Sequence, residues 1–195
     1  RYFNYFVLYI LMKKNINKFN IAIVGIGYVG LPLAVEFGKK YVTTGYDVNK
    51  NRINELNNYK DSTLTISSKE IKNANLLKFT DNLNDITKCN FFIITVPTPV
   101  DKNNKPDLSS LNQASIKVGK LLKKYDIVVY ESTVYPGVTE EYCVPILEKN
   151  SKLKYNKDFF VGYSPERINP GDKINSLKNI CKIISGSNIQ TVNII

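Results

Sequence analysis

The sequence predicts an α/β fold in which helices cover both faces of a doubly wound, mostly parallel sheet. Short apolar segments that suit buried strands alternate along the chain with segments whose apolar residues have helical spacing. The first apolar segment runs directly into a glycine-rich turn, "GIGYVG". The length of 195 residues suffices for one sizeable domain with its own core.

The predicted strands are short runs rich in valine, isoleucine and phenylalanine, as expected of strands that are buried on both faces. Because helical segments separate them, the strands are expected to pair in parallel. In chain order, we predict strands within residues 19–25, 41–48, 76–80, 89–97, 126–133, 158–165 and 180–186.

The segments between the strands have the apolar spacing of helices that pack on a sheet. The second of them places Ile53 and Leu56 on one face, and Ser67 or Ser68 is expected to cap the next, short helix before Glu70. We predict helices within residues 28–40, 49–58, 61–76, 81–88, 106–122 and 137–150.

Three boundaries are predicted from single residues. Asp81 is expected to cap the short helix that precedes the fourth strand. The helix after that strand is expected to open at Pro106 or Asp107, and Pro145 to kink the last predicted helix. The inner face of the helix that opens near residue 106 is predicted to consist of Leu108, Leu111, Ala114, Ser115, Val118, Leu121 and Leu122.

The turn after the first strand has the spacing G-x-G-x-x-G, and each glycine has its own expected purpose. Gly25 permits the tight turn, Gly27 lets a pyrophosphate approach the backbone, and Gly30 lets the helix pack closely on the strand. Backbone amides near Tyr28 and Val29 would donate to the phosphates at the helix N-terminus. In this strand–turn–helix context, the motif predicts a Rossmann-type dinucleotide-binding domain rather than a glycine-rich turn without a ligand.

Asp47 ends the second predicted strand, near the distance at which an acidic residue accepts the ribose hydroxyls of the adenosine. A carboxylate there repels a 2′-phosphate, which favours NAD over NADP as the cofactor. Arg52 complicates this interpretation, because it could lie against the adenine or accommodate a 2′-phosphate. A solvated surface ion pair is a further explanation of Arg52.

Ligands of an open α/β sheet bind beyond the carboxyl ends of the strands, and polar loops follow three of the predicted strands there, at residues 96–101, 130–137 and 163–172. Thr98 and Thr133 offer hydroxyls beside the expected nicotinamide position. Glu166 could bind or activate a water molecule, and Arg167 could hold a phosphate or a sugar. The simpler alternative is that these are loop prolines with a surface ion pair.

The net charge of +10 comes from lysines scattered along the chain, without a run of five like charges. We therefore expect neither nucleic acid nor a membrane as a partner. The chain contains no histidine, which excludes a Cys/His zinc site, and no metal is expected. Cys89, Cys143 and Cys181 lie within or beside apolar segments and are interpreted as small buried side chains in a reducing, cytoplasmic compartment.

Both ends of the chain suggest a fragment. Residues 1–18 are predicted to be an extension, with Met12 as the true start, and residues 19–195 to be the dinucleotide-binding domain. The apolar run at residues 2–11 is far shorter than the ~20 residues that span a bilayer.

Several stretches together resemble the UDP-glucose/GDP-mannose dehydrogenase family, and among its members the bacterial UDP-N-acetylhexosamine dehydrogenases, such as those specific for UDP-N-acetylgalactosamine or UDP-N-acetylglucosamine. They cover most of residues 19–187, and the last three are highly specific: "GIGYVGLPLAVEFGKK", "GYDVNKNRINEL", "DSTLT", "VPTPVD", "PDLSSL", "DIVVYESTVYPGVTEE" and "VGYSPERINPGDK". The resemblance implies oxidation of the sugar C6 hydroxymethyl group to a carboxylate in two steps with NAD, for surface polysaccharide biosynthesis.

The resemblance also implies roles for individual residues. The residues that would contact NAD are Val29, Asp47, Arg52, Thr98 and Thr133. Thr133 would in addition order the catalytic water, and Glu166 would handle that water or a proton. Arg167 and Ile168, together with Glu166, would contact the nucleotide sugar.

The chain departs from the family pattern in what it lacks. The family's nucleophilic cysteine, which would trap the aldehyde and form a thioester, lies in a motif beyond the end of this chain, and none of the three cysteines matches it. The central helix that forms the family's homodimer and most of the UDP site are also outside. Asn175 stands where close relatives have histidine. We expect a fragment that is inactive alone; the alternatives are another Rossmann dehydrogenase or a stand-alone NAD-binding module.

Overall fold

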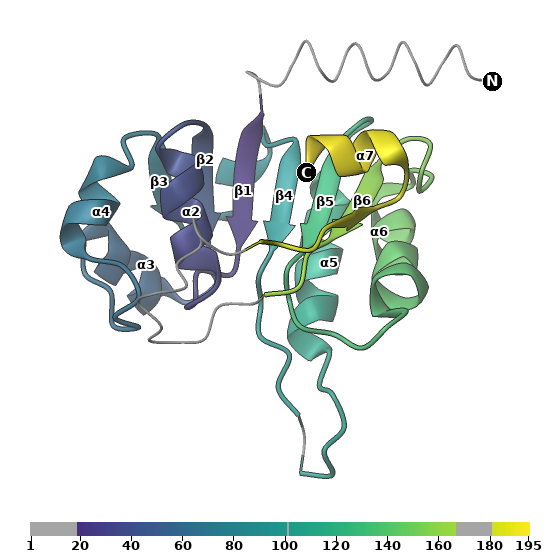
Figure 1. Cartoon of the computed structure of the whole chain (residues 1–195), viewed down its shortest axis with the longest axis horizontal. Helices are drawn as coiled ribbons and strands as arrows, with labels where there is room; N and C mark the ends of the chain where they lie inside the picture. Colours follow the sequence, from purple (N-terminus) through teal and green to yellow (C-terminus); the bar gives the residue numbers. More distant parts are fainter. Residues whose placement is uncertain (1–18, 101, 167–180) are drawn as a thin grey trace.

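The computed structural model describes residues 19–100, 102–166 and 181–195. Within them, seven strands form one sheet in the order β3-β2-β1-β4-β5-β6-β7 (Figure 1). Neighbouring strands are parallel except β7, which is antiparallel to β6. This confirms the predicted mostly parallel, doubly wound sheet. The strands are β1 (Asn20–Val24), β2 (Val42–Tyr46), β3 (Leu77–Thr80), β4 (Phe91–Ile94), β5 (Ile127–Tyr130), β6 (Phe160–Tyr163) and β7 (Ser185–Gly186).

Helical segments connect the strands, and their starts are set by local side-chain hydrogen bonds. Ser67 caps α4 in a complete capping box with Glu70, as predicted. The helical segments are α2 (Gly30–Gly38), α3 (Lys50–Asn57), α4 (Ser68–Asn73), the 3₁₀-helix η2 (Leu83–Ile86), α5 (Ser109–Leu121), the π-helix η3 (Val138–Cys143), α6 (Val144–Ser151) and α7 (Ile189–Ile194).

Two predicted helix starts were wrong by one to three residues. The cap of η2 is Asn82 rather than Asp81, because the Asn82 side chain accepts a hydrogen bond from the amide of Asn84. Helix α5 begins at Ser109 rather than at Pro106 or Asp107, because the Asp107 side chain accepts a hydrogen bond from the Ser109 amide and holds the preceding residues in a turn.

The structure also differs from the prediction at two irregular segments. Near Pro145, the backbone changes from the π-helix η3 to the α-helix α6, so that the proline occupies the first turn of α6, where it needs no intrahelical donor. The last predicted strand is wrong over most of its length, since only Ser185 and Gly186 pair with β6, and helix α7 follows. Residue 180 of that predicted strand lies outside the described residues.

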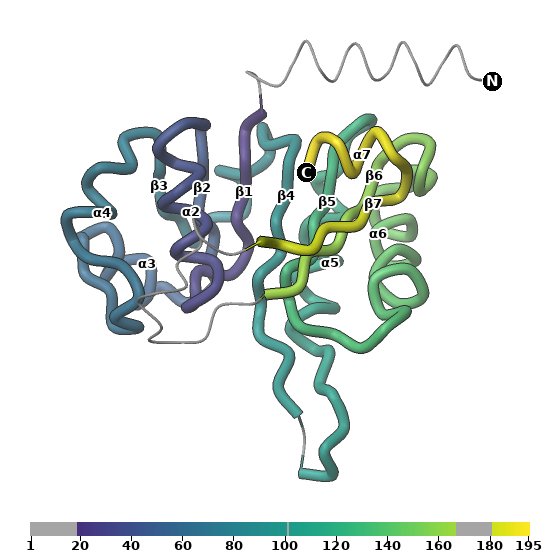
Figure 2. The backbone as a smooth tube through the Cα atoms, in the orientation of Figure 1, coloured from purple at the N-terminus to yellow at the C-terminus, as the bar shows by residue number. Residues whose placement is uncertain are grey.

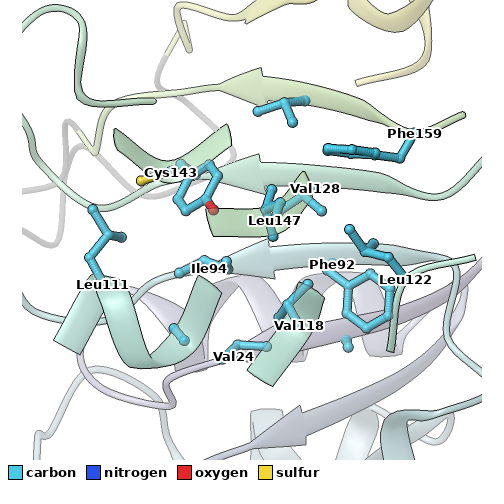
Figure 3. Packing of buried hydrophobic residues seen from close by; sticks show 14 of the residues in the cluster. Val24, Phe92, Ile94, Leu111, Val118, Leu122, Val128, Cys143, Leu147 and Phe159 are labelled. Carbon is cyan, nitrogen blue, oxygen red and sulfur yellow. The ribbon is translucent and has the colours of Figure 1, made fainter. Parts of the chain in front are cut away.

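Alternate side chains of the central strands enter two hydrophobic clusters, one on each face of the sheet. In β1, Ala22 and Val24 belong to the cluster that α5 and α6 cover (Figure 3), whereas Ile21 and Ile23 belong to the cluster under α2, α3 and α4. The same alternation holds in β4 and β5, as the period of two in a strand requires. Helices therefore cover both faces, as predicted (Figure 1).

The order of the strands places a crevice at one edge of the sheet. From β1 the chain proceeds outward to β2 and β3, and it then returns to β4 on the other side of β1. In such sheets, ligands bind beyond the carboxyl ends of the strands where the order reverses. The connection from β4 to α5 extends beyond this edge (Figure 2) and contains an antiparallel bridge between Val100 and Pro106. Of the helices in the described ranges, none combines the length and the apolar character needed to cross a bilayer.

Candidate cofactor-binding site

A cavity of about 670 Å³ lies at the carboxyl ends of β1, β2 and β4, where the strand order reverses. Its volume is in the range typical of small-molecule and cofactor sites. Most of its lining surface is apolar, which suits the flat faces of an adenine ring. The polar lining residues are Asp47, Asn49, Arg52, Thr63, Ser109, Ser110, Gln113 and Lys117.

The three glycines of the motif differ in what surrounds them. Gly25 has a φ of +98°, which residues with a side chain rarely adopt. A Cβ atom on Gly30 would collide with the carbonyl oxygen of Gly25 and lie 2.6 Å from the Thr95 hydroxyl. By contrast, a Cβ on Gly27 would meet no described atom within 4 Å, and Gly27 lines the cavity. The packing of the protein thus requires Gly25 and Gly30, whereas Gly27 leaves room for a ligand.

The N-terminus of α2 offers hydrogen-bond donors beside this space. Its N-cap residue, Val29, provides no side-chain cap, and the first turn contains no acidic residue. The first amides of a helix lack intrahelical acceptors and, together with the helix dipole, attract anions. Tyr28, Val29 and Gly30 are not among the residues that line the cavity itself. They connect Gly27 to the first turn of α2.

Asp47 lies at the carboxyl end of β2 and lines the cavity, as the motif predicts. Its Oδ2 accepts a hydrogen bond of 2.7 Å from the amide of Ile26, and its Oδ1 accepts one of 2.9 Å from the amide of Asn49. A carboxylate has about four acceptor positions, so two remain for hydroxyl donors of a ligand. The residue therefore both shapes the glycine-rich turn and presents acceptors to the cavity.

Arg52 is buried rather than solvated, which excludes the interpretation as a solvated surface pair. Its Nε donates a hydrogen bond of 2.8 Å to the carbonyl oxygen of Ile26. Its Nη2 forms an ion pair of 2.8 Å with Asp61, and its Nη1 lies 3.4 Å from Glu55. The guanidinium thus joins the glycine-rich turn, helix α3 and the loop that begins at Asp61.

Burial by itself would raise the pKa of Asp61, but several hydrogen bonds outweigh it. Donors from Thr63, Ile66, Arg52 and Thr65 favour the ionised carboxylate and together lower the pKa from 3.8 to about 2. The carboxylate is therefore ionised at any pH at which the fold is expected to be used.

The predicted reaction-side residues lie at the carboxyl ends of the neighbouring strands β4, β5 and β6. The Thr98 hydroxyl donates a hydrogen bond of 2.5 Å to the carbonyl oxygen of Thr133, so that these two loops meet as expected. Glu166 follows β6, and its side chain is 8% exposed. Arg167, Ile168 and Asn175 lie outside the described residues.

The Glu166 carboxylate faces a charged pair that the sequence did not reveal. Its Oε2 lies 3.9 Å from Nζ of Lys182, which forms a close ion pair with the buried Glu131. Burial raises the pKa of Glu131, the positive charge of Lys182 opposes the rise, and Glu166 adds to it. Two carboxylates therefore share one cation at this end of the sheet.

Sequence reasoning missed several residues of the cavity. It also missed Thr95, which does not line the cavity but donates a hydrogen bond of 2.5 Å to the carbonyl oxygen of Gly25, a cavity residue 70 positions away in the chain. No local pattern reveals that contact. A signal existed on helix α5, where Ser109, Gln113 and Lys117 follow each other at intervals of four residues and therefore share one face. All three line the cavity.

The cysteines agree with the sequence prediction only in part. Cys89 and Cys143 are buried, and burial raises the pKa of each thiol to about 11, which keeps them protonated and unreactive. Cys181 is exposed, so that the interpretation as a buried side chain was wrong there. It lies on the segment that precedes β7, outside both hydrophobic clusters.

Known proteins match this chain over the whole domain. Residues 19–195 match the UDP-glucose/GDP-mannose dehydrogenase family, NAD binding domain. The chain is 61% identical over 167 residues to UDP-N-acetyl-D-glucosamine 6-dehydrogenase of Pseudomonas aeruginosa, a match that covers 86% of this chain and 40% of that protein. It is 57% identical over 180 residues to the enzyme with the same name from Salmonella typhi, covering 92% of this chain and 42% of that protein.

The fold agrees with a solved relative as well. The structure of NDP-N-acetyl-D-galactosaminuronic acid dehydrogenase from Methanosarcina mazei Go1 matches with a TM-score of 0.85 at 29% identity, covering 96% of this chain and 42% of that chain. The chain thus spans about two fifths of the length of these relatives. With the matched family model, the relatives and the cavity at the glycine-rich turn in agreement, the chain belongs to the UDP-glucose/GDP-mannose dehydrogenase family, as its NAD-binding domain.

Proposed function

We propose that this chain is the NAD-binding part of an enzyme that oxidises the C6 hydroxymethyl group of a UDP-N-acetylhexosamine to a carboxylate, in two NAD-dependent steps, for surface polysaccharide biosynthesis. The observation that carries the cofactor site is the open space at Gly27, next to a cavity that Asp47 lines. The names of the relatives support the sugar substrate. Turnover requires the part of these relatives that the chain does not span.

The adenosine and pyrophosphate end of the cofactor is assigned to the cavity. Asp47 accepts the ribose hydroxyls with its two remaining acceptor positions, while Gly27 lets the pyrophosphate approach. Amides at Tyr28 and Val29 donate to the phosphates, because nothing caps this end of α2. Arg52 forms part of the wall beside the adenosine.

The reaction is assigned to the loops after β4, β5 and β6. When bound, NAD⁺ accepts a hydride from the carbon that is oxidised. Thr98 holds the loop of Thr133 through its hydrogen bond, and Thr133 itself is exposed, so that its hydroxyl is available to orient a water molecule. Glu166 lies on the same edge, where its carboxylate is assigned to binding that water or moving a proton. Arg167 and Ile168 are proposed to contact the nucleotide sugar.

The remaining assignments concern the whole protein. We expect residues 19–195, which the family match covers, to form the NAD-binding domain. The buried thiols Cys89 and Cys143 are consistent with a cytoplasmic enzyme. The full-length enzyme is expected to be a homodimer that acts on a UDP-sugar without nucleic-acid or membrane partners.

Calorimetric titration of this chain with NAD⁺, and then with NADP⁺, tests the cofactor site. Saturable binding of NAD⁺ that weakens at least about tenfold in Asp47→Ala is expected, because loss of one charged hydrogen-bonding partner costs about 1.5–3 kcal/mol. Asp81→Ala is the matched control, since Asp81 is exposed and does not line the cavity. A folded chain that binds neither nucleotide would refute the assignment.

A further inference from the structure

The guanidinium of Arg52 lies in the wall of the cofactor cavity with its charge already engaged. Asp61 lies 2.8 Å from Nη2, Glu55 lies 3.4 Å from Nη1, and Nε is bound to the carbonyl oxygen of Ile26. The residue is only 8% exposed. An arginine in this position could serve a 2′-phosphate only if its two outer nitrogens were released from their carboxylate partners.

Asp61 is fixed more firmly than an ordinary surface carboxylate. Its side chain is 1% exposed. Its Oδ1 accepts the amide of Thr63 at 3.0 Å, and its Oδ2 accepts the amides of Thr65 and Ile66 at 2.8 and 3.0 Å. The loop therefore wraps around the carboxylate, and Thr63 on this loop lines the cavity. Because the loop holds Asp61, Asp61 in turn can hold the guanidinium against competition from a ligand.

We propose that Asp61 is a specificity-determining residue of the cofactor site: by binding Arg52, it withholds the guanidinium from a 2′-phosphate, so that the site takes NAD⁺ and rejects NADP⁺. The inference rests on the proposed assignment of the cavity to the adenosine end of the cofactor. From the sequence alone, an arginine near Asp47 is compatible with either NAD or NADP. The ion pair between Arg52 and Asp61 favours NAD.

The charges around the cavity agree with this assignment. Asp47, Glu55 and Asp61 contribute three negative charges, and Arg52 and Lys117 contribute two positive ones, so that these five groups are negative before any phosphate arrives. The Lys117 ammonium donates one hydrogen bond, of 3.2 Å, to the neutral Tyr46 hydroxyl and keeps its positive charge. A doubly charged 2′-phosphate would therefore meet a net negative charge from these five groups, and the guanidinium among them already lies against two carboxylates.

The test compares the affinities of this chain for NAD⁺ and NADP⁺ by calorimetry in wild type and variants. In Asp61→Asn, the released guanidinium is expected to raise the NADP⁺/NAD⁺ affinity ratio at least about tenfold, and less so at high salt. The double variant Asp61→Asn/Arg52→Gln is expected to lose this gain. Glu140→Gln removes one negative charge at an exposed position of η3, outside the cavity lining, and is expected to leave the ratio unchanged.

In Asp61→Asn, the side-chain NH₂ group would replace one acceptor oxygen and face backbone N–H donors, which destabilises the folded loop. Glu55→Gln is a second variant that tests the inference, because it removes only the carboxylate that pairs with Nη1 of Arg52. It is expected to raise the NADP⁺/NAD⁺ affinity ratio about twofold to fivefold, the effect of losing a partly exposed ion pair. If wild type binds NAD⁺ but the folded variants have an unchanged NADP⁺/NAD⁺ affinity ratio, the role of Asp61 is refuted while the cofactor site stands. A gain that persists without Arg52 would do the same. Folded wild type that binds no NAD⁺ would refute the proposed cofactor site first.

Discussion

The same substitution, glycine to alanine, is expected to have opposite effects at Gly27 and Gly30. At Gly30 the added methyl group would collide with the Gly25 carbonyl oxygen and approach the Thr95 hydroxyl to 2.6 Å. At Gly27 the methyl group would meet no described atom within 4 Å. The first change should therefore affect the fold, and the second should affect only what approaches the turn from the cavity.

The magnitudes follow from these surroundings. Gly30→Ala forces the start of α2 away from β1, and insertion of a methyl group into a tightly packed site costs about 1–3 kcal/mol. Gly27 does not adopt a positive φ, so that alanine brings no backbone strain there. Gly27→Ala is expected to stabilise the folded chain by about 0.4–1 kcal/mol, because alanine restricts the unfolded chain.

Urea denaturation followed by circular dichroism measures the free energy of unfolding of both variants, and calorimetry measures their affinity for NAD⁺. Gly27→Ala should retain its stability and lose at least about tenfold in affinity, as its methyl group occupies the space assigned to the pyrophosphate. The reasoning fails if Gly27→Ala unfolds as easily as Gly30→Ala, or if it binds NAD⁺ as wild type does.

Two further predictions concern buried polar groups of the fold. Burial raises the pKa of Asp126 from 3.8 to about 6, so that wild type loses stability as pH rises through this interval. Asp126→Asn keeps an acceptor for the Lys123 amide. In urea denaturation, this variant should be as stable as wild type near pH 4. At pH 7 it should be more stable by up to about 3 kcal/mol, since each pKa unit corresponds to about 1.4 kcal/mol. Equal stabilities at pH 7 would contradict this. Thr95→Val removes the hydroxyl bound to the Gly25 carbonyl and should cost about 1–3 kcal/mol in the same assay; an unchanged midpoint would contradict it.

The sequence predicted those features that depend on residues close together in the chain. The glycine-rich turn, the capping box of Ser67 and the buried strands all follow from local spacing. Their parallel pairing follows from the helical segments between them. The start of α5 was placed too early, since a single hydrogen bond, from the Ser109 amide to the Asp107 side chain, decides it. Such competition between local conformations is decided by small energy differences that spacing does not reveal.

Contacts between distant segments could not be predicted in this way. The apolar run before Gly186 has the composition of a strand, yet only its last two residues pair with β6. Two partners of Arg52, Ile26 and Asp61, lie in other segments, and no periodicity connects them to it. The sequence therefore predicted Arg52 as a candidate cofactor residue but left its partner undetermined, and we propose that this partner decides what the guanidinium can bind.

The amide and the carbonyl group of Ile26 show why an effect on cofactor binding is difficult to separate from an effect on the fold at this site. Its amide is held by Asp47 and its carbonyl oxygen by Arg52, so that both candidate cofactor residues also fix the backbone of the glycine-rich turn. A turn held from both sides is ordered before the cofactor arrives, which lowers the entropic cost of binding. For the same reason, weaker binding in Asp47→Ala could reflect a lost ribose contact or a displaced turn. Gly27→Ala leaves both hydrogen bonds of Ile26 in place, and a loss of affinity there can arise only at the surface that faces the cavity.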